Sequence, residues 1–379
     1  MDELAEVAGL LTADHPSSAQ AIEKSRRRLM NEAARRHRWH PRRSSEPAGK
    51  ATSRRTALVA GLSAVMMVAA AWGVHAWMTR PLYHPEPLAG QSGPAASFLL
   101  AAADGRARHA SSGRHWYLHT LNGTTAVVRS PTRPNVRYTV EVRASVFNLA
   151  QNGASSGAKM YEWDGDDVEV RPVSPADHAA WTADWQPDAD ALKVEPPHGQ
   201  RGPEPEEGGY FDIGPPEARE LPSDPSELRA WILNYATKFD HERLRQPDLY
   251  LFIYAPLLLA ELPVSDRVRI ATYRILASLK GVRMVDATDA TGRKGRAVSM
   301  VQTTPAYGTI DWQLFIDPST GRLTASQGVV VKGGSKNAGV PPGSRQFFQI
   351  VKKADWTNES SRKLLPGWIW NKNWEPPFD

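Results

Sequence analysis

Hydrophobic and polar positions follow three different rhythms along the chain, and each rhythm predicts a different kind of element. The first is a continuous apolar run at 56–78, TALVAGLSAVMMVAAAWGVHAWM, which contains no Asp, Glu, Lys or Arg. A helix over this run rises about 1.5 Å per residue and reaches roughly 34 Å, enough to cross a hydrocarbon core of about 30 Å. The run therefore predicts one transmembrane helix.

The second rhythm is an alternation of period two, which is typical of strands. It is clearest at 136–147, where Val136, Tyr138 and Val140 face one way and the intervening residues Arg137 and Thr139 face the other. This pattern predicts a half-buried strand. Further strands are predicted at 115–121, 159–163, 282–287, 296–302, 309–316, 323–331 and 346–352. Short turns such as 289–292 and 317–321 join the last five, so we expect an antiparallel meander.

The third rhythm, close to 3.6 residues, predicts helices at 224–239 and 265–280, and alanine-rich composition predicts a short helix at 95–110. In the helix at 224–239, Asp224 is the expected N-cap and Pro225 the first helical residue. The segment 249–260 is apolar but too short to span a membrane and contains Pro256, so we expect a buried helix. Helices grouped apart from a meander predict an α+β fold.

Charge fixes the orientation of the apolar run. The formal net charge is +5, from 46 Lys and Arg against 41 Asp and Glu. Residues 1–55 already sum to +5, while 79–379 hold 34 bases and 34 acids and sum to zero. Because basic flanks stay on the cytoplasmic side, 1–55 is predicted to be cytoplasmic and 79–379 extracytoplasmic. Arg54 and Arg55 before an apolar run also fit a cleaved export signal, which stays open as an alternative.

The chain is thus divided into a cytoplasmic segment 1–55 with a short basic helix near 17–38, a transmembrane helix 56–78, a Pro/Gly linker 79–94 and an extracytoplasmic domain 95–379. Within the domain, an acidic Pro/Gly-rich insertion near 164–224 is expected to be a mobile polar loop. Residues 161–227 carry 18 acids against four bases, and 228–379 carry 21 bases against 13 acids. The basic stretch before the span is expected to contact anionic lipid, and no nucleic acid partner is expected.

Recognisable catalytic chemistry is absent. There is no cysteine, which removes disulfides, thiolate zinc sites and Cys nucleophiles, and no nucleotide-binding, metalloprotease or nucleophile-elbow motif occurs. We therefore assign no catalytic, cofactor-binding or metal-binding residues and expect no cofactor. His75 is the one ionisable group within the predicted span and is interpreted as lying neutral near its outer end.

Two clusters leave alternatives open. The acids Asp164, Asp166 and Asp167, with Glu162 and Glu169 nearby, form either a turn between two strands or a calcium site. The aromatic tail Trp368, Trp370, Trp374 and Phe378 either packs onto the sheet or stacks on a sugar.

The acidic start MDEL, the basic helix, the single span and the motifs LPSDPSELRAWIL, AELPVSDRVRIATYRILASLKGVRMVDATDATGRKGRAV and LFIDPSTGRL together resemble an actinobacterial family of single-pass membrane proteins. That family is uncharacterised in function and is often encoded beside extracytoplasmic-function sigma factors. The resemblance is most specific over 221–330 and implies a topology but no catalytic residue. The layout also resembles the fold of periplasmic lipoprotein carriers and sigma-regulator sensors, which implies a curved antiparallel sheet packed with helices.

Three functions follow as hypotheses. The first is a non-enzymatic cell-membrane protein with an extracytoplasmic sensing or binding domain, whose cytoplasmic segment contacts a sigma factor or another regulator. The second is a carrier or trap for lipid, lipoprotein or another apolar molecule held between the sheet and the helix at 249–260. The third is an envelope hydrolase, which requires a cleft with paired carboxylates or a Ser–His pair.

Overall fold

The computed structural model describes residues 81–90, 92–152, 160–194, 206–207, 215–237 and 243–372. The chain divides into a smaller unit, Met1–His84 with Asn234–Leu244, and a larger unit, Pro85–Leu233 with Arg245–Asp379. The predicted cytoplasmic segment 1–55 and transmembrane helix 56–78 lie outside the described residues. Within the described ranges, none of the helices combines the length and the apolar composition that crossing a membrane requires.

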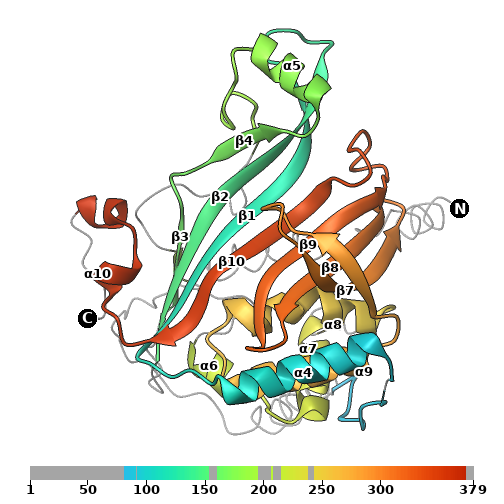
Figure 1. The fold of residues 1–379 in the computed structure, drawn as a ribbon, viewed down its shortest axis with the longest axis vertical. Helices are drawn as coiled ribbons and strands as arrows, with labels where there is room; N and C mark the ends of the chain where they lie inside the picture. The colour runs from blue at the N-terminus through green and yellow to red at the C-terminus, as the bar shows by residue number, and fades with distance from the viewer. Residues whose placement is uncertain are drawn as a thin grey trace, which may run out of the picture. The chain divides into compact units, whose positions relative to one another are not determined.

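The larger unit is built on one antiparallel sheet, whose strands run in the order β5-β3-β2-β1-β10-β9-β8-β7-β6 (Figure 1), with β4 paired to β2. Eight of these strands were predicted from the sequence, whereas β4 and β5 were not. The strands are β1 His115–Arg129, β2 Arg137–Gln151, β3 Met160–Asp164, β4 Glu169–Pro172, β5 Glu206–Glu207, β6 Arg283–Thr288, β7 Lys294–Thr304, β8 Gly308–Asp317, β9 Arg322–Lys332 and β10 Arg345–Thr357.

Helices pack against this sheet, and α4 lies alongside α9 (Figure 1). The α+β class is therefore confirmed for the described residues. The helices are α4 Pro94–Arg108, α5 Pro175–Ala183, α6 Pro215–Arg219, α7 Pro225–Ala236, α8 Pro247–Pro256, the π-helical turn η2 Leu257–Glu261, α9 Asp266–Ser278, α10 Ser361–Leu364 and the 3₁₀ helix η3 Gly367–Lys372.

The predicted helix starts are confirmed by their caps. Asp224 Oδ1 accepts hydrogen bonds from the backbone N–H of Ser226 at 2.9 Å and of Glu227 at 3.0 Å, at the start of α7. Ser265 is the N-cap of α9, since its hydroxyl accepts from Val268 N. These side chains satisfy backbone donors that have no partner inside the helix.

The turns of the meander are also as predicted, and two of them require glycine. Asp289 Oδ1 accepts from Thr291 N at 2.9 Å and Arg293 N at 3.1 Å, and Gly292 has a φ of +87°. Gly321 in the β8–β9 turn has a φ of +61°, and a Cβ there would lie 2.3 Å from Ala102 O of α4. The second turn is thus a packing site for α4 as well as a chain reversal.

Strand β2 departs from the half-buried pattern expected for it. Its residues alternate as predicted, but the polar face is buried too, with Glu141 9% and Arg143 8% exposed. Arg143 pairs with Glu141 and lies 5.6 Å from the ring of Phe348 on β10. The alternation of residues within β2 cannot show that its polar face is covered, because the covering side chain, Phe348, comes from a distant part of the chain.

The acidic segment near 164–224 is partly ordered, which corrects its description as a mobile loop. It supplies β4, α5 and α6, and β4 pairs with β2. Ser174 Oγ accepts from Asp177 N at the start of α5, and Pro175 occupies the first turn. This local cap begins a helix inside a composition that favours disorder.

In the smaller unit, the described residues are 81–84, 234–237 and 243–244, and Tyr83 is their centre. Its N–H donates to Asn234 Oδ1 at 2.8 Å, and its carbonyl accepts from Asn234 Nδ2 at 2.7 Å. Leu244 N donates to the Tyr83 hydroxyl at 2.7 Å. Part of the predicted linker 79–94 is therefore held by side-chain contacts.

Candidate functional site

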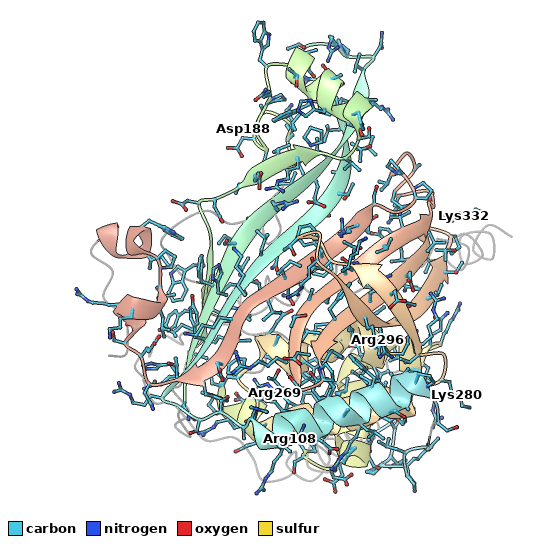
Figure 2. All side chains as sticks on the ribbon, viewed as in Figure 1. Arg108, Asp188, Arg269, Lys280, Arg296 and Lys332 are labelled. Atoms are coloured by element: carbon cyan, nitrogen blue, oxygen red, sulfur yellow. The ribbon has the colours of Figure 1, made fainter. Side chains whose placement is uncertain are left out.

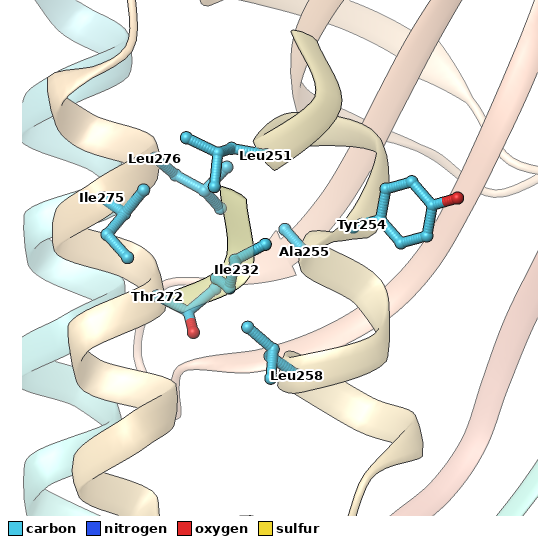
Figure 3. Close-up of a pocket in the computed structure, with 8 residues that line it drawn as sticks. All are labelled: Ile232, Leu251, Tyr254, Ala255, Leu258, Thr272, Ile275 and Leu276. Carbon is cyan, nitrogen blue, oxygen red and sulfur yellow. The ribbon is translucent and has the colours of Figure 1, made fainter. Parts of the chain in front are cut away.

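The helix predicted at 249–260 is confirmed as buried, and the space beside it is closed. Side chains of α7, α8, η2 and α9 surround a cavity of about 10 Å³ (Figure 3). A cavity needs about 10–15 Å³ to hold one water molecule, so this space admits no acyl chain. The lining residues are Ile232, Leu251, Tyr254, Ala255, Leu258, Thr272, Ile275 and Leu276.

A buried guanidinium holds this helical layer together. The helix passes through Pro256 into the π-helical turn η2, and the carbonyls that follow need donors. Arg269 on α9 donates to Leu259 O at 3.3 Å, to Leu262 O at 3.0 Å and to Val264 O. Its side chain is 1% exposed, and its Cζ lies 4.1 Å from the ring centre of Trp116 on β1.

The charge of Arg269 is partly offset within the core by Asp266, which is shared with Arg106. Burial, and after it the neighbouring Arg106, lowers the pKa of Arg269 to about 9, whereas Asp266 opposes that change. Asp266 pairs with Arg106 and Arg269, and its second oxygen accepts from Ser111 N at 2.8 Å. These ionised groups form ion pairs that join α4 to α9, so their role is structural.

A second buried pair links η2 to the sheet. Gln349 Nε2 on β10 donates to Glu261 Oε1 at 3.0 Å, and Trp116 Nε1 donates to Glu261 O at 3.2 Å. The polar groups of the interior therefore position helices on strands, and their arrangement does not present a reactive group to solvent.

His119 on β1 is a half-buried histidine that packs on the sheet. It stacks on Phe147 at 4.4 Å, and its Nε2 has no hydrogen-bond partner among the described residues. Burial, and secondly Lys352, lowers the pKa of His119 to about 4, against an opposing effect of Asp167. It is therefore neutral at physiological pH and packs as an aromatic ring.

The acidic cluster of the sequence is used in turn contacts. Asp167 Oδ1 accepts from Ser145 N at 2.9 Å, and Asp167 Oδ2 accepts from Ser145 Oγ at 2.6 Å. Glu169 pairs with Arg171. No group of three metal-ligating side chains occurs within the described ranges. The contacts of Asp167 and Glu169 favour the turn interpretation over a calcium site.

The aromatic tail is described only in part. Trp368 packs against a buried cluster that includes Tyr117, Phe147 and Trp163, together with Leu364 and Ile369 of the tail segment. Core packing therefore explains Trp368. The side chain of Trp370, and the whole of Trp374 and Phe378, lie outside the described residues.

An open groove of about 570 Å³ lies where α8 begins, α9 ends and β6 starts the sheet edge. Leu249, Met300 and Val301 supply apolar surface, and the side chain of Val301 is 43% exposed. Lys280 stands at the rim with Arg283, whose guanidinium donates to Asp311 Oδ1 at 2.8 Å. The remaining lining residues are Gln246, Pro247, Asp248 and Gly281.

This groove was not predicted from the sequence, because its residues come from 246–249, 280–283 and 300–301. Asp248 is already engaged, since it accepts from Lys280 N at 3.2 Å and pairs with Arg229 at 3.5 Å. The groove therefore combines an apolar floor with a cationic rim. It suits an occupant with an apolar side chain next to an acid.

No family model and no curated protein sequence matches the chain. Among solved structures, the MucA/MucB complex of Pseudomonas aeruginosa is 13% identical, with 75% of this chain and 67% of that chain covered and a TM-score of 0.21. A crystal structure of MucB is 12% identical, with coverage of 75% and 68% and a TM-score of 0.21. The LolA superfamily protein NE2245 from Nitrosomonas europaea is 10% identical, with coverage of 73% and 100% and a TM-score of 0.15.

At TM-scores of 0.21 and below, the similarity supports no conclusion about the fold or the role of this chain. The expected resemblance to the fold of lipoprotein carriers and sigma-regulator sensors therefore stays a prediction. Membership of the actinobacterial single-pass family stays a prediction.

Proposed function

We propose that this chain is a non-enzymatic, single-pass envelope protein whose extracytoplasmic domain binds other proteins at its surface. The cytoplasmic segment 1–55 would carry the response to a sigma factor or another regulator. The observation that supports surface binding is the contrast between two spaces. The interior beside α8 holds about 10 Å³, whereas the groove at the sheet edge is open and holds about 570 Å³.

A lipid carrier is the second candidate, with its ligand expected between the sheet and the helix at 249–260. The cavity of about 10 Å³ lies instead among α7, α8, η2 and α9, and an acyl chain could enter it only after α8 had moved away from α9. Native mass spectrometry of the protein purified without added lipid tests this role, and a stoichiometric co-purified lipid would favour it over surface binding.

The membrane anchor is tested in the full chain, which contains no cysteine of its own. Single substitutions Ser45→Cys and Ser335→Cys place a thiol on either side of the predicted span. Intact cells treated with an impermeant maleimide should label Ser335→Cys and leave Ser45→Cys unlabelled. Labelling of both, or release of the protein by alkaline carbonate, would contradict the topology.

The binding and signalling parts are tested with a reporter for a sigma factor encoded beside the gene. Deletion of residues 2–55 and the charge reversal Lys280→Glu should each change reporter output at equal protein level. Lys332→Glu is the matched control, because Lys332 is an exposed lysine at the end of β9, away from the groove (Figure 2). An unchanged reporter after the deletion contradicts signalling. Equal effects of the two charge reversals contradict a role for the groove.

A further inference from the structure

A strained and exposed tryptophan stands at the outer end of the β1–β2 hairpin. Trp185 follows α5, is 89% exposed and has a φ of +64°, and Gln186 has a φ of +54°. The left-handed region is costly for a bulky residue and is adopted only when the surroundings enforce it.

The residues on either side of Trp185 show how this conformation is enforced. Asp184 accepts from Thr132 Oγ1 at 2.6 Å and from Arg133 Nε at 3.0 Å, on the turn between β1 and β2. Trp181 Nε1 donates to Pro187 O at 2.9 Å. Both ends of the short loop are therefore fixed, and the backbone at Trp185 directs its indole into solvent.

The surface around Trp185 combines small side chains, one ion pair and an exposed acid. Arg133, whose side chain is 40% exposed, is paired with Asp184 next to Trp185. Helix α5 has no buried residue, and its exposed positions include Ala176, Ala179 and Ala183. Asp188 is exposed three residues after Trp185. We call Trp185, the exposed face of α5 and Asp188 the hairpin tip. Tryptophan is enriched among the residues that anchor protein interfaces.

The groove at the sheet edge is complementary to the hairpin tip. It offers an aromatic side chain the apolar surface of Val301, which is 43% exposed, next to Leu249 and Met300, which are 7% and 5% exposed. It also offers Lys280 to a carboxylate. Its volume of about 570 Å³ lies within the range of pockets that enclose small organic groups. The charges of the two segments are also opposite. The hairpin tip belongs to 161–227, which is acidic, and the groove belongs to 228–379, which is basic.

The hairpin tip and the groove of one chain do not meet. Strand β1 alone has 15 residues and extends about 50 Å from its base to the hairpin tip. Asp188 and Lys280 lie at opposite ends of the larger unit (Figure 2). A contact between the two surfaces therefore requires two molecules.

We propose that the groove receives the hairpin tip of a second copy of this chain, with Trp185 on the apolar floor and Asp188 beside Lys280. The proposal rests on the groove put forward above as the binding surface and names its occupant. A contact of this size is small, and small interfaces are transient in solution. Anchoring both copies in one membrane would raise their effective concentration and so favour the contact.

Disulfide cross-linking of the full chain in lipid vesicles tests the proposal. Two differently tagged copies are mixed, one with Gln186→Cys at the hairpin tip and one with Val301→Cys in the groove. The mixed disulfide should form at least tenfold faster than with Lys332→Cys, an exposed position outside the groove. Equal rates for the two partners would overturn the proposal.

Two further variants identify the contacts. Adding Trp185→Ala to the Gln186→Cys copy should slow cross-linking at least tenfold, whereas Leu100→Ala, which removes a 46% exposed side chain elsewhere, should leave the rate unchanged. Asp188→Asn keeps the carbonyl oxygen that accepts from Ala191 N and removes the charge. If Asp188 meets Lys280, the rates with Asp188→Asn, Lys280→Gln and both together should show coupling rather than independent effects.

The outcomes separate this inference from the proposed function. If Lys280→Glu changes the reporter while Trp185→Ala leaves cross-linking unchanged, the groove binds a different protein and the self-contact is wrong. If a fluorophore at Gln186→Cys is shielded by lipid in vesicles that hold one copy each, the hairpin tip binds the membrane surface, and the self-contact is again wrong.

Discussion

Replacing Arg269 with methionine should destabilise the fold strongly, because this one side chain serves the whole segment after α8. Methionine has a similar length and fills part of the same volume, but it donates no hydrogen bond. The carbonyls of Leu259 and Val264 would then lose this donor inside the core, whereas Leu262 O would keep the backbone N–H of Val264 at 2.8 Å. Asp266 would keep only Arg106 as an ionic partner.

The size of the effect follows from these contacts. A buried acceptor left without a donor costs about 1–3 kcal/mol, and two such carbonyls, those of Leu259 and Val264, are involved. Removing the guanidinium also removes the cost of burying a charge, which offsets part of the loss. The net loss should be about 2–4 kcal/mol, because Asp266 keeps Arg106 and no buried charge is left unpaired. For a domain of this size, that lowers Tm by about 10 °C.

The measurement is chemical and thermal unfolding of the full chain in detergent. Arg274→Met is the control, because Arg274 lies on the same helix and is exposed. That variant should stay within about 0.5 kcal/mol of the parent protein. A loss below about 1 kcal/mol for Arg269→Met would refute the assignment of Arg269 as the donor that holds η2.

Three further results are expected. Gly321→Ala should destabilise the fold by more than about 2 kcal/mol, because the added Cβ would meet Ala102 O. Gly343→Ala, at a φ of +86° with open space around it, is the control and should cost about 1 kcal/mol. Equal losses of unfolding free energy in denaturant titration would contradict the contact with α4. Leu258→Ala, beside the closed cavity, should lower the unfolding free energy by about 2–5 kcal/mol in the same titration. The enlarged cavity should bind xenon or benzene, whereas the parent protein should bind neither. Burial raises the pKa of Asp184, but hydrogen bonds from Thr132 and Arg133 outweigh burial and lower the pKa to about 2. The stabilisation by ionised Asp184 should therefore be present above about pH 4 and be lost as the pH falls towards 2. The unfolding free energy of Asp184→Asn should depend less on pH over that window, and an unchanged pH dependence would contradict the assignment.

Local signals in the sequence were sufficient for most elements. The caps at Asp224 and Ser265 and the turns at Asp289 and Asp317 act within four residues of themselves, so a pattern search finds them. Helix α5 has an equally good local cap at Ser174. It was missed because the acidic, Pro-rich composition of the surrounding segment outweighed that cap in the prediction.

The candidate sites could not be found in this way, because they depend on contacts between distant segments. An arginine on an amphipathic helix normally faces solvent, and nothing near Arg269 in the sequence shows that η2 will bring three carbonyls to it. The groove joins Lys280 to Met300 and Leu249 only after the sheet has formed. Trp185 was one of 13 tryptophans, and its exposure follows from the tight loop between Asp184 and Pro187.

The position of β10 has a consequence for how the chain folds. This strand is the last of the sheet to be synthesised, yet it lies between β1 and β9, with His115 opposite Thr357. Until it is available, the β1–β2 hairpin and the β6–β9 meander each expose an unpaired edge, and exposed edges promote aggregation. Pairing over such a sequence separation slows folding. The two halves of the sheet therefore join late, and a chain truncated before residue 345 should accumulate as an aggregating intermediate.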